Sequence, residues 1–416
     1  MSRTWIRQAE GAKAACQALS MMTREEKDEA LMNMAKALGR AAPAVLSANR
    51  KDTAAARKKG ISAAMIARLT LDLSKIEKIA AGIESVARLA DPVGRLLWQR
   101  RRPNGLKIKK ISVPLGSILI IYEARPNVTA DCMALCLKSG NAVILKGGSE
   151  ALKTNLAMFR AMSAAAIKAG VPRGAFQFVA TADRKAVAGL LQLSGLIDLV
   201  IPRGGEGLIR EVARLSKIPV IKHYKGVCHL YVDEAADLAM AERVVVNAKT
   251  QNPSVCNALE CLLVHRKVAK QFLPRLAAVL KAKGVRMRAD AAARAIVKDA
   301  ERATAADWGA EYLDLVLAVK VVKDMEEAIR HITTYGSSHS DGIITSDKRR
   351  SLRFMGAVDS SAVFVNCSTR FNDGGEFGMG AEMGISTDKL HARGPMGLEE
   401  LTSYKYLVEG DGQIRS

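Results

Sequence analysis

The chain contains two continuous apolar runs, SILIIY at residues 117–122 and AVILK at residues 142–146, with a helix-like segment at residues 129–138 between them. Uninterrupted runs of this kind are typical of parallel strands that are buried on both faces. A helical pattern over residues 151–169 follows the second run. Three shorter strand candidates lie at residues 176–179, 198–201 and 219–221. This alternation of buried strands with helices predicts an α/β fold with a doubly wound parallel sheet.

Further helices and two exposed strands are expected around this sheet. Apolar residues recur at helical spacing over residues 25–39 and again over residues 76–89. Residues 107–113 instead alternate apolar side chains with lysines, as an exposed or intersubunit strand would. Residues 404–408, YKYLV, predict another strand that could pair across subunits.

The composition indicates a globular protein with a basic surface. Hydrophobic residues make up 49% of the chain, which excludes wholesale disorder. A length of 416 residues is long for a single core and predicts two or three domains. The formal net charge is +21, but aromatic residues are only 4% and the basic runs lie far apart, so nucleic-acid binding is disfavoured. No apolar stretch approaches the roughly 20 residues that span a bilayer, and the N-terminus has no apolar signal core. We therefore expect a cytoplasmic protein that binds neither nucleic acid nor membranes.

Cys256 is the candidate nucleophile. It lies in QNPSVCNALE at residues 251–260, where Pro253, a capping Ser254 and a short helical stretch would place the sulfur at a helix N-terminus. Such a position favours the thiolate, which is the nucleophile in acyl transfer. The alternative is a buried cysteine that acts as a small hydrophobic residue. The seven cysteines and six histidines show no spacing typical of disulfides or metal ligands, so neither is expected.

Polar and glycine-rich loops follow three of the expected strands. These loops are YEARPN at residues 122–127, KGGS at residues 146–149 and PRGGEG at residues 202–207. Ligands of open α/β sheets bind outside the carboxyl ends of the strands, and glycine backbone N–H groups can approach phosphate closely. The sequence therefore predicts an anion-binding or cofactor-binding edge. The last loop is not a GxGxxG fingerprint, however, and an ordinary strand-to-helix turn explains it equally well.

Several stretches, in this order, resemble the aldehyde dehydrogenase superfamily, and more narrowly its branch that reduces glutamyl phosphate. They are IYEARPNVT at residues 121–129, IPRGG at 201–205, VNAKTQ at 246–251 running into Cys256, STRF at 368–371 and HARGPMGLE at 391–399. The resemblance implies an α/β, aldehyde dehydrogenase-like fold with two doubly wound α/β domains and a small β oligomerisation element. The implied parts are an NADPH-binding domain at 1–99 and 114–226 with part of 372–395, a catalytic domain at 227–371, and the oligomerisation element at 100–113 and 396–416.

The resemblance also implies a reaction, namely NADPH-dependent reduction of L-glutamate 5-phosphate to L-glutamate 5-semialdehyde and phosphate. This is the second step of proline biosynthesis from glutamate. Cys256 would form a thioester, and Asn127 would stabilise the oxyanion, although Asn127 also fits a simple turn residue after Pro126. Lys222 stands roughly where oxidising members carry the glutamate that activates water, which favours hydride over water as the second reactant. A related NAD(P)-dependent aldehyde dehydrogenase, or an acyl-phosphate reductase for another substrate, remains the alternative.

The resemblance assigns further residues to ligands. Lys146 matches the lysine that contacts the adenosine ribose, and the uncharged Ser149, with Lys153 nearby, suits the 2′-phosphate of NADPH. The expected cofactor-binding residues are Lys146, Gly147, Gly148, Ser149, Pro202, Arg203, Gly204, Gly205 and Glu311. The expected substrate-binding residues are Arg125, Asn252, Ser254, Thr369 and Arg370. The implied partners are a second copy of the chain, in a dimer or tetramer, and a possible coupling to glutamate 5-kinase.

Overall fold

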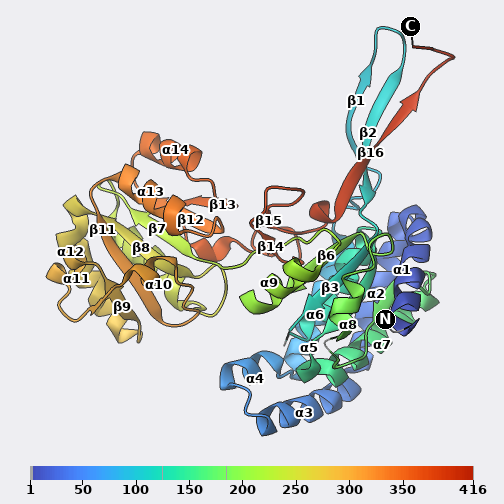
Figure 1. The fold of residues 1–416 in the computed structure, drawn as a ribbon, viewed down its shortest axis with the longest axis horizontal. Coiled ribbons are helices and arrows are strands. Elements are labelled where there is room, and N and C mark those ends of the chain that lie inside the picture. The colour runs from blue at the N-terminus through green and yellow to red at the C-terminus, as the bar shows by residue number, and fades with distance from the viewer. Residues whose placement is uncertain (1–2, 124, 184, 416) are drawn as a thin grey trace. The chain divides into compact units, whose positions relative to one another are not determined.

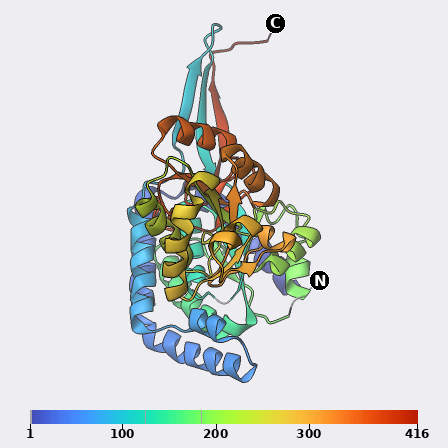
Figure 2. The same ribbon diagram turned by 90° about the vertical axis from the view of Figure 1, so that its left-hand side faces the viewer.

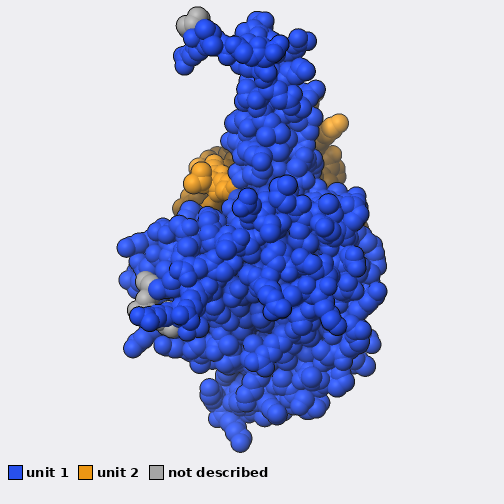
Figure 3. Space-filling model, turned by 90° about the vertical axis from the view of Figure 1, so that its right-hand side faces the viewer, with its two compact units in different colours: residues 1–222, 378–384, 396–416 blue, residues 223–377, 385–395 orange. Residues whose placement is uncertain are grey.

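The structure is a computed structural model that describes residues 3–123, 125–183 and 185–415. The chain divides into two compact units (Figure 3). Unit 1 comprises Met1–Lys222, Gly378–Gly384 and Met396–Ser416, and unit 2 comprises His223–Phe377 and Ile385–Pro395. The division of the chain by function, as cofactor domain, catalytic domain and oligomerisation element, stays a prediction.

Unit 1 is built on the parallel sheet that the apolar runs predict. Its strands follow the order β5-β4-β3-β6, with β3 at Ser117–Tyr122, β4 at Ala142–Gly147, β5 at Phe176–Phe178 and β6 at Leu199–Arg203. Every residue of β3 and β4 is buried, as expected for strands covered on both faces. Residues 219–221 do not form the predicted strand, because Val220 makes only an isolated bridge to Val200.

Helices surround this sheet (Figure 1). Before it come α1 (Arg3–Met21), α2 (Arg24–Arg40), α3 (Ala42–Lys58), α4 (Ala63–Leu69) and α5 (Leu73–Arg88); within it come α6 (Asn127–Lys138), α7 (Leu152–Lys168), α8 (Lys185–Leu190) and α9 (Glu206–Leu215). The helix predicted at residues 25–39 is confirmed as α2. Thr23 caps it in a capping box with Glu26, and its apolar face is buried.

A narrow antiparallel arm extends from the rest of unit 1. Its strands are β1 (Leu96–Arg101), β2 (Lys107–Pro114) and β16 (Thr402–Glu409), in the order β1-β2-β16, and they lie side by side in both ribbon views (Figure 1 and Figure 2). The strands predicted at residues 107–113 and 404–408 are therefore confirmed, and they pair with each other within the chain. Tyr404, Tyr406 and Val408 on the edge strand are 50%, 52% and 58% exposed.

Unit 2 contains a longer parallel sheet in the order β10-β9-β11-β8-β7-β12-β13. Its strands are β7 (Cys228–Val232), β8 (Leu259–His265), β9 (Arg286–Ala289), β10 (Glu301–Arg302), β11 (Val316–Val322), β12 (Ser340–Ile344) and β13 (Ala362–Val365). Its helices are α10 (Leu238–Thr250), α11 (Arg266–Ala282), α12 (Ala291–Ile296), α13 (Met325–Tyr335) and α14 (Lys348–Ala357). Two short strands, β14 (Ile385–Ser386) and β15 (Gly394–Pro395), pair antiparallel.

Both faces of the unit 2 sheet are covered, because alternate strand residues enter two different hydrophobic clusters. Leu262 and Val264 of β8 pack in the cluster that contains residues of α10, α11 and α12. Cys261 and Leu263 pack in the cluster that contains residues of α13 and α14. The doubly wound α/β fold class is thus confirmed. Among the described residues, no helix is both long and apolar enough to cross a membrane.

Candidate active site

Cys256 lies in a turn between α10 and β8, half-buried, rather than at the start of a helix. The predicted helix after it is wrong, because residues 259–265 form a fully buried strand between β7 and β11. Ser254 does not cap a helix either. Its backbone N–H and its hydroxyl both donate to Oδ1 of Asn252, at 3.3 and 3.1 Å. A polar turn, and not a helix dipole, therefore presents the thiol.

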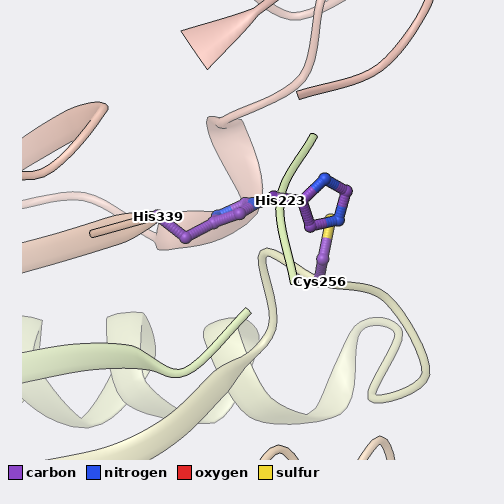
Figure 4. A group of neighbouring side chains, drawn as sticks. All are labelled: His223, Cys256 and His339. Carbon is purple, nitrogen blue, oxygen red and sulfur yellow. The ribbon is translucent and has the colours of Figure 1, made fainter. Parts of the chain in front are cut away.

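Two histidines flank the sulfur (Figure 4). One ring nitrogen of His223, one of His339 and Sγ of Cys256 all lie within 4.8 Å of one another. The two rings meet edge to face, with centroids 5.5 Å apart. This arrangement can transfer a proton from the thiol to an imidazole, as cysteine nucleophiles require, and the same three atoms could also bind a metal ion.

The cluster sits at the amino edge of the unit 2 sheet. His223 precedes β7, Cys256 precedes β8 and His339 precedes β12, and these three strands are neighbours. The carboxyl ends of the strands, where the sequence predicts the ligand-binding loops, contain neither histidine. The only sequence signal is weak, since His223 immediately follows Lys222, the position at which a catalytic base would be expected.

Close packing fixes the backbone of Cys256. A side chain on Gly226 would bring its Cβ to 1.9 Å from the carbonyl oxygen of Cys256, so this approach requires glycine. The thiol of Cys228 donates to the same carbonyl oxygen at 3.1 Å. Burial raises the pKa of Cys228 well above its usual range, so Cys228 stays a protonated donor.

Gly226→Ala should therefore displace the Cys256 turn and lower activity at least about tenfold, because a misplacement of about 1 Å is costly in catalysis. The measurement is kcat/KM beside the thermal unfolding midpoint. Gly356→Ala is the matched control, because nothing lies within 4 Å of the added Cβ in α14. Equal activity of the two variants would show that the close approach is unimportant.

Among the substrate residues predicted from sequence, Thr369 and Arg370 lie in the same unit as Cys256, in the short 3-10 helix η3 (Thr369–Phe371). The guanidinium of Arg370 donates to Oε1 of Gln251 at 2.8 Å. Burial lowers the pKa of Arg370, while the charges of Asp373 and of Cys256 act in the opposite direction. The guanidinium of Arg370 is thus close enough to Cys256 for their charges to interact. Thr369 donates its hydroxyl to the carbonyl of Asn257 at 2.7 Å and so supports the turn.

Glu311 also belongs to unit 2, and it supports the same region. Its carboxylate accepts the backbone N–H of Gly226 at 2.8 Å. Asn127 and Arg125 lie in unit 1, where Asn127 begins α6 and donates to Oδ2 of Asp131 at 2.9 Å. Burial raises the pKa of Asp131 to about 6.

The cofactor residues predicted in unit 1 meet at the carboxyl edge of its sheet. Strand β3 lies between β4 and β6, so Ile121 pairs with both Lys146 and Pro202, and Tyr122 pairs with both Gly147 and Arg203. The two glycine-containing loops therefore lie on either side of the end of β3. Ligands of open α/β sheets bind at such a place. Burial lowers the pKa of Lys146, whose ammonium donates to the carbonyl of Gly147 at 2.8 Å.

Two acids at this edge were not identified from the sequence. The carboxylate of Glu123 accepts the N–H of Gly205 at 3.0 Å, at the start of α9, where the sequence suggested a phosphate contact. Glu150 covers Gly148, since a Cβ added to Gly148 would come within 2.1 Å of its carboxylate. Arg203 faces Glu382 at 4.0 Å. The residues at this edge still fit a dinucleotide, because glycine N–H groups and a buried lysine are present.

Comparison with known proteins identifies the family. The model of the aldehyde dehydrogenase family matches residues 4–310. The chain belongs to the aldehyde dehydrogenase family. Within that family it is 54% identical to a gamma-glutamyl phosphate reductase of Moorella thermoacetica, over 97% of each chain. It is 53% identical to one of Geobacter metallireducens, over 98% of this chain and 97% of the relative.

Solved structures of aldehyde dehydrogenase family members agree with the fold. The crystal structure of gamma-glutamyl phosphate reductase from Thermotoga maritima matches with a TM-score of 0.97 and 44% identity, covering 99% of this chain and 100% of that one. An acetylating aldehyde dehydrogenase from Geobacillus thermoglucosidasius shares the fold with a TM-score of 0.70 at 19% identity, over 100% and 98% of the two chains. Membership of this family implies a nicotinamide cofactor.

Proposed function

We propose that this chain reduces L-glutamate 5-phosphate to L-glutamate 5-semialdehyde and phosphate with NADPH, the second step of proline biosynthesis from glutamate. One observation carries the chemistry, namely the half-buried thiol of Cys256 with two imidazoles within 4.8 Å. A nucleophile beside a proton acceptor is what acyl transfer requires. The relatives named gamma-glutamyl phosphate reductase, which are 54% and 53% identical over nearly the whole chain, support this choice of substrate.

In the first step, His223 takes the proton of the Cys256 thiol, and the sulfur attacks the acyl carbon of the substrate. The S–C bond forms, the C–O bond to phosphate breaks, and His223 gives its proton to the departing phosphate. Because the proton passes from thiol to phosphate, the step releases hydrogen phosphate and leaves a neutral thioester. Arg370 lies close enough to Cys256 for their charges to interact. Asn127 is proposed to donate to the oxyanion.

A bound reduced nicotinamide supplies the hydride that converts the thioester to the aldehyde level. The residues of this chain then complete the turnover. The C–S bond breaks as the aldehyde forms, and Cys256 leaves as a thiolate. His223 takes up a proton from solvent and passes it to the thiolate, which restores the thiol. We propose that Arg125, Asn252, Ser254, Thr369 and Arg370 bind the substrate, whose carboxylate and phosphate suit arginine.

We propose that NADPH is held by Lys146, Gly147, Gly148, Ser149, Pro202, Arg203, Gly204, Gly205 and Glu311. Ser149 carries no charge that would repel a 2′-phosphate, and Lys153 nearby is exposed and attracts one. The carboxylate of Glu150 at Gly148 acts against this preference. The balance of Lys153 and Glu150 therefore sets the selectivity between NADPH and NADH.

Glu150→Gln should raise the ratio of kcat/KM for NADPH over NADH by about two- to fivefold, because an exposed charge interaction is worth up to about 1 kcal/mol. Lys153→Ala should lower the same ratio. It should lower kcat/KM for NADPH and leave kcat/KM for NADH unchanged. The measurement is kcat/KM with each cofactor at low salt. Unchanged ratios in both variants would place the adenosine ribose elsewhere.

The test of the function itself is the reverse reaction. Glutamate semialdehyde, phosphate and NADP⁺ are mixed with the purified chain, and absorbance of the reduced nicotinamide is followed. Phosphate-dependent reduction is the expected result. Reduction without phosphate would instead identify an aldehyde dehydrogenase that hydrolyses its thioester, and absence of reduction under both conditions would exclude this substrate.

We also propose that the arm joins copies of this chain, because an edge strand with exposed apolar side chains is a template for pairing. Replacing Tyr406 and Val408 together by lysine should shift the protein to smaller species in sedimentation velocity. Lys405→Ala, on the same strand, is the control. An unchanged sedimentation profile of the double variant would exclude the arm as the contact. Coupling to glutamate 5-kinase stays a prediction.

A further inference from the structure

We propose that His223, Cys256 and His339 bind a thiophilic divalent cation of the zinc type, in addition to their part in turnover. The sulfur and one nitrogen of each ring lie within 4.8 Å of one another (Figure 4). In a tetrahedral zinc site, bonds of about 2.0–2.3 Å place such donors roughly 3.3–3.7 Å apart. Small side-chain rotations therefore bring all three atoms onto one ion.

The imidazole of His223 is already oriented for a metal. Its Nδ1 lies 2.8 Å from the carbonyl oxygen of Ile385, and a carbonyl can only accept a hydrogen bond. Nδ1 therefore carries the hydrogen, and Nε2 carries the lone pair that a cation needs. Metal-binding histidines typically donate their second N–H to a carbonyl or carboxylate in this way.

The ring of His339 is held through its other nitrogen. Its Nδ1 contacts Oγ of Ser340 at 2.8 Å and Sγ of Cys228 at 3.8 Å. Asn372 donates to the Ser340 hydroxyl at 2.7 Å and holds it in place. Because Nδ1 of His339 is engaged with these two residues, Nε2 is the atom that we propose as the metal ligand.

Access and charge set the character of the site. Cys256 and His223 are half-buried whereas His339 is fully buried, so an ion reaches the site from the side of Cys256 and His223. Three protein ligands leave a fourth position for water. The positive charge of Arg370 acts on Cys256 and weakens cation binding. A second group of donors, His229, Cys261 and His331, is buried in the core with at most 5% exposure. That group offers an incoming ion no comparable access.

Binding of a cation by His223, Cys256 and His339 has a direct consequence for turnover. The cation takes the lone pairs of Cys256 and His223, and the thiol proton is released to solvent. The nucleophile and its base are then both blocked, so the cation inhibits reversibly. This consequence rests on the proposed function, whereas cation binding itself does not.

The experiment is an optical titration of the purified full chain with Co²⁺, which reports thiolate ligation by a sulfur-to-metal charge-transfer band. We expect one equivalent to bind with this band, and Cys256→Ala to lose it. His223→Ala should weaken binding at least about tenfold, since even outer partners of metal ligands contribute roughly 10–100-fold to affinity. His391→Asn is the matched control and should bind as the unaltered chain does, because His391 is exposed and asparagine tolerates its φ of 69°.

Persistence of the band in Cys256→Ala, or equal affinities of His223→Ala and His391→Asn, would overturn the proposal. His339→Gln adds a third ligand test when circular dichroism shows that the variant is folded. In a parallel assay, Zn²⁺ should inhibit the reductase, and a chelator should restore activity. Because the Co²⁺ titration needs no turnover, an inactive protein would refute the proposed function and leave the cation site to be decided by the titration.

Discussion

Cys256→Ala should abolish reductase activity, lowering kcat by about 10⁴-fold or more, as removal of a nucleophile does in other covalent enzymes. No thioester can form without the sulfur. The neighbouring Cys228 cannot replace it, because burial raises the pKa of Cys228 and keeps its thiol protonated. The fold should be unaffected, because the side chain is half-buried in a turn and outside both hydrophobic clusters of unit 2. The measurement is phosphate-dependent reduction of NADP⁺ with glutamate semialdehyde, beside the thermal unfolding midpoint.

The matched control is Cys367→Ala, because Cys367 is a half-buried cysteine of the same unit. Burial raises the pKa of Cys367, so it is expected to be an unreactive thiol. If Cys367→Ala lost activity and Cys256→Ala kept it, the nucleophile would be Cys367 and not Cys256. Mass spectrometry adds an independent readout, since a single acyl adduct should be found on Cys256.

His223→Ala should lower kcat by about 10²–10⁴-fold, the usual contribution of a general acid–base group. His223 lies beside the sulfur, and its hydrogen bond to the Ile385 carbonyl leaves Nε2 as the proton acceptor. Added imidazole should restore part of the activity of this variant, because it can carry the same proton. It should not restore Cys256→Ala.

The rescue experiment separates proton transfer from a purely structural role. If His223 only shaped the site, free imidazole would leave His223→Ala as slow as before. His391→Asn controls for loss of a histidine elsewhere in unit 2, and it should retain full activity. A variant His223→Ala with unaltered kcat would assign the proton transfer to His339 or to solvent.

Much of the fold follows from local sequence. The runs at residues 117–122 and 142–146 are buried on both faces, so burial and β propensity agree, and the structure confirms both strands. The spacing of apolar residues predicts the helix at residues 25–39, and the structure confirms it with a buried apolar face and a capping box at Thr23. The prediction of a helix after Cys256 was wrong, because a short apolar run fits a helix or a strand equally well. Pairing with β7 and β11 makes this run a strand.

The site was harder to predict than the fold. Cys256 stood out by its residue type and by resemblance, but His223 and His339 lie far apart in the chain and meet only because β7 and β12 are neighbours. Glu150 escaped notice for a different reason. The sequence position of Glu150, directly after Ser149, does not tell where its side chain points. Only the conformation of the loop brings its carboxylate onto Gly148.

The arm also matters for how the protein is made. Strand β2 pairs with β1, its close neighbour in the sequence, on one edge, and with β16, near the C-terminus, on the other. During synthesis, β2 therefore waits with one edge bare until β16 has left the ribosome. A chain that ends after β2 but before Thr402 keeps that edge open, and open strand edges promote aggregation. Strand β16 thus covers an edge that such shorter products would expose.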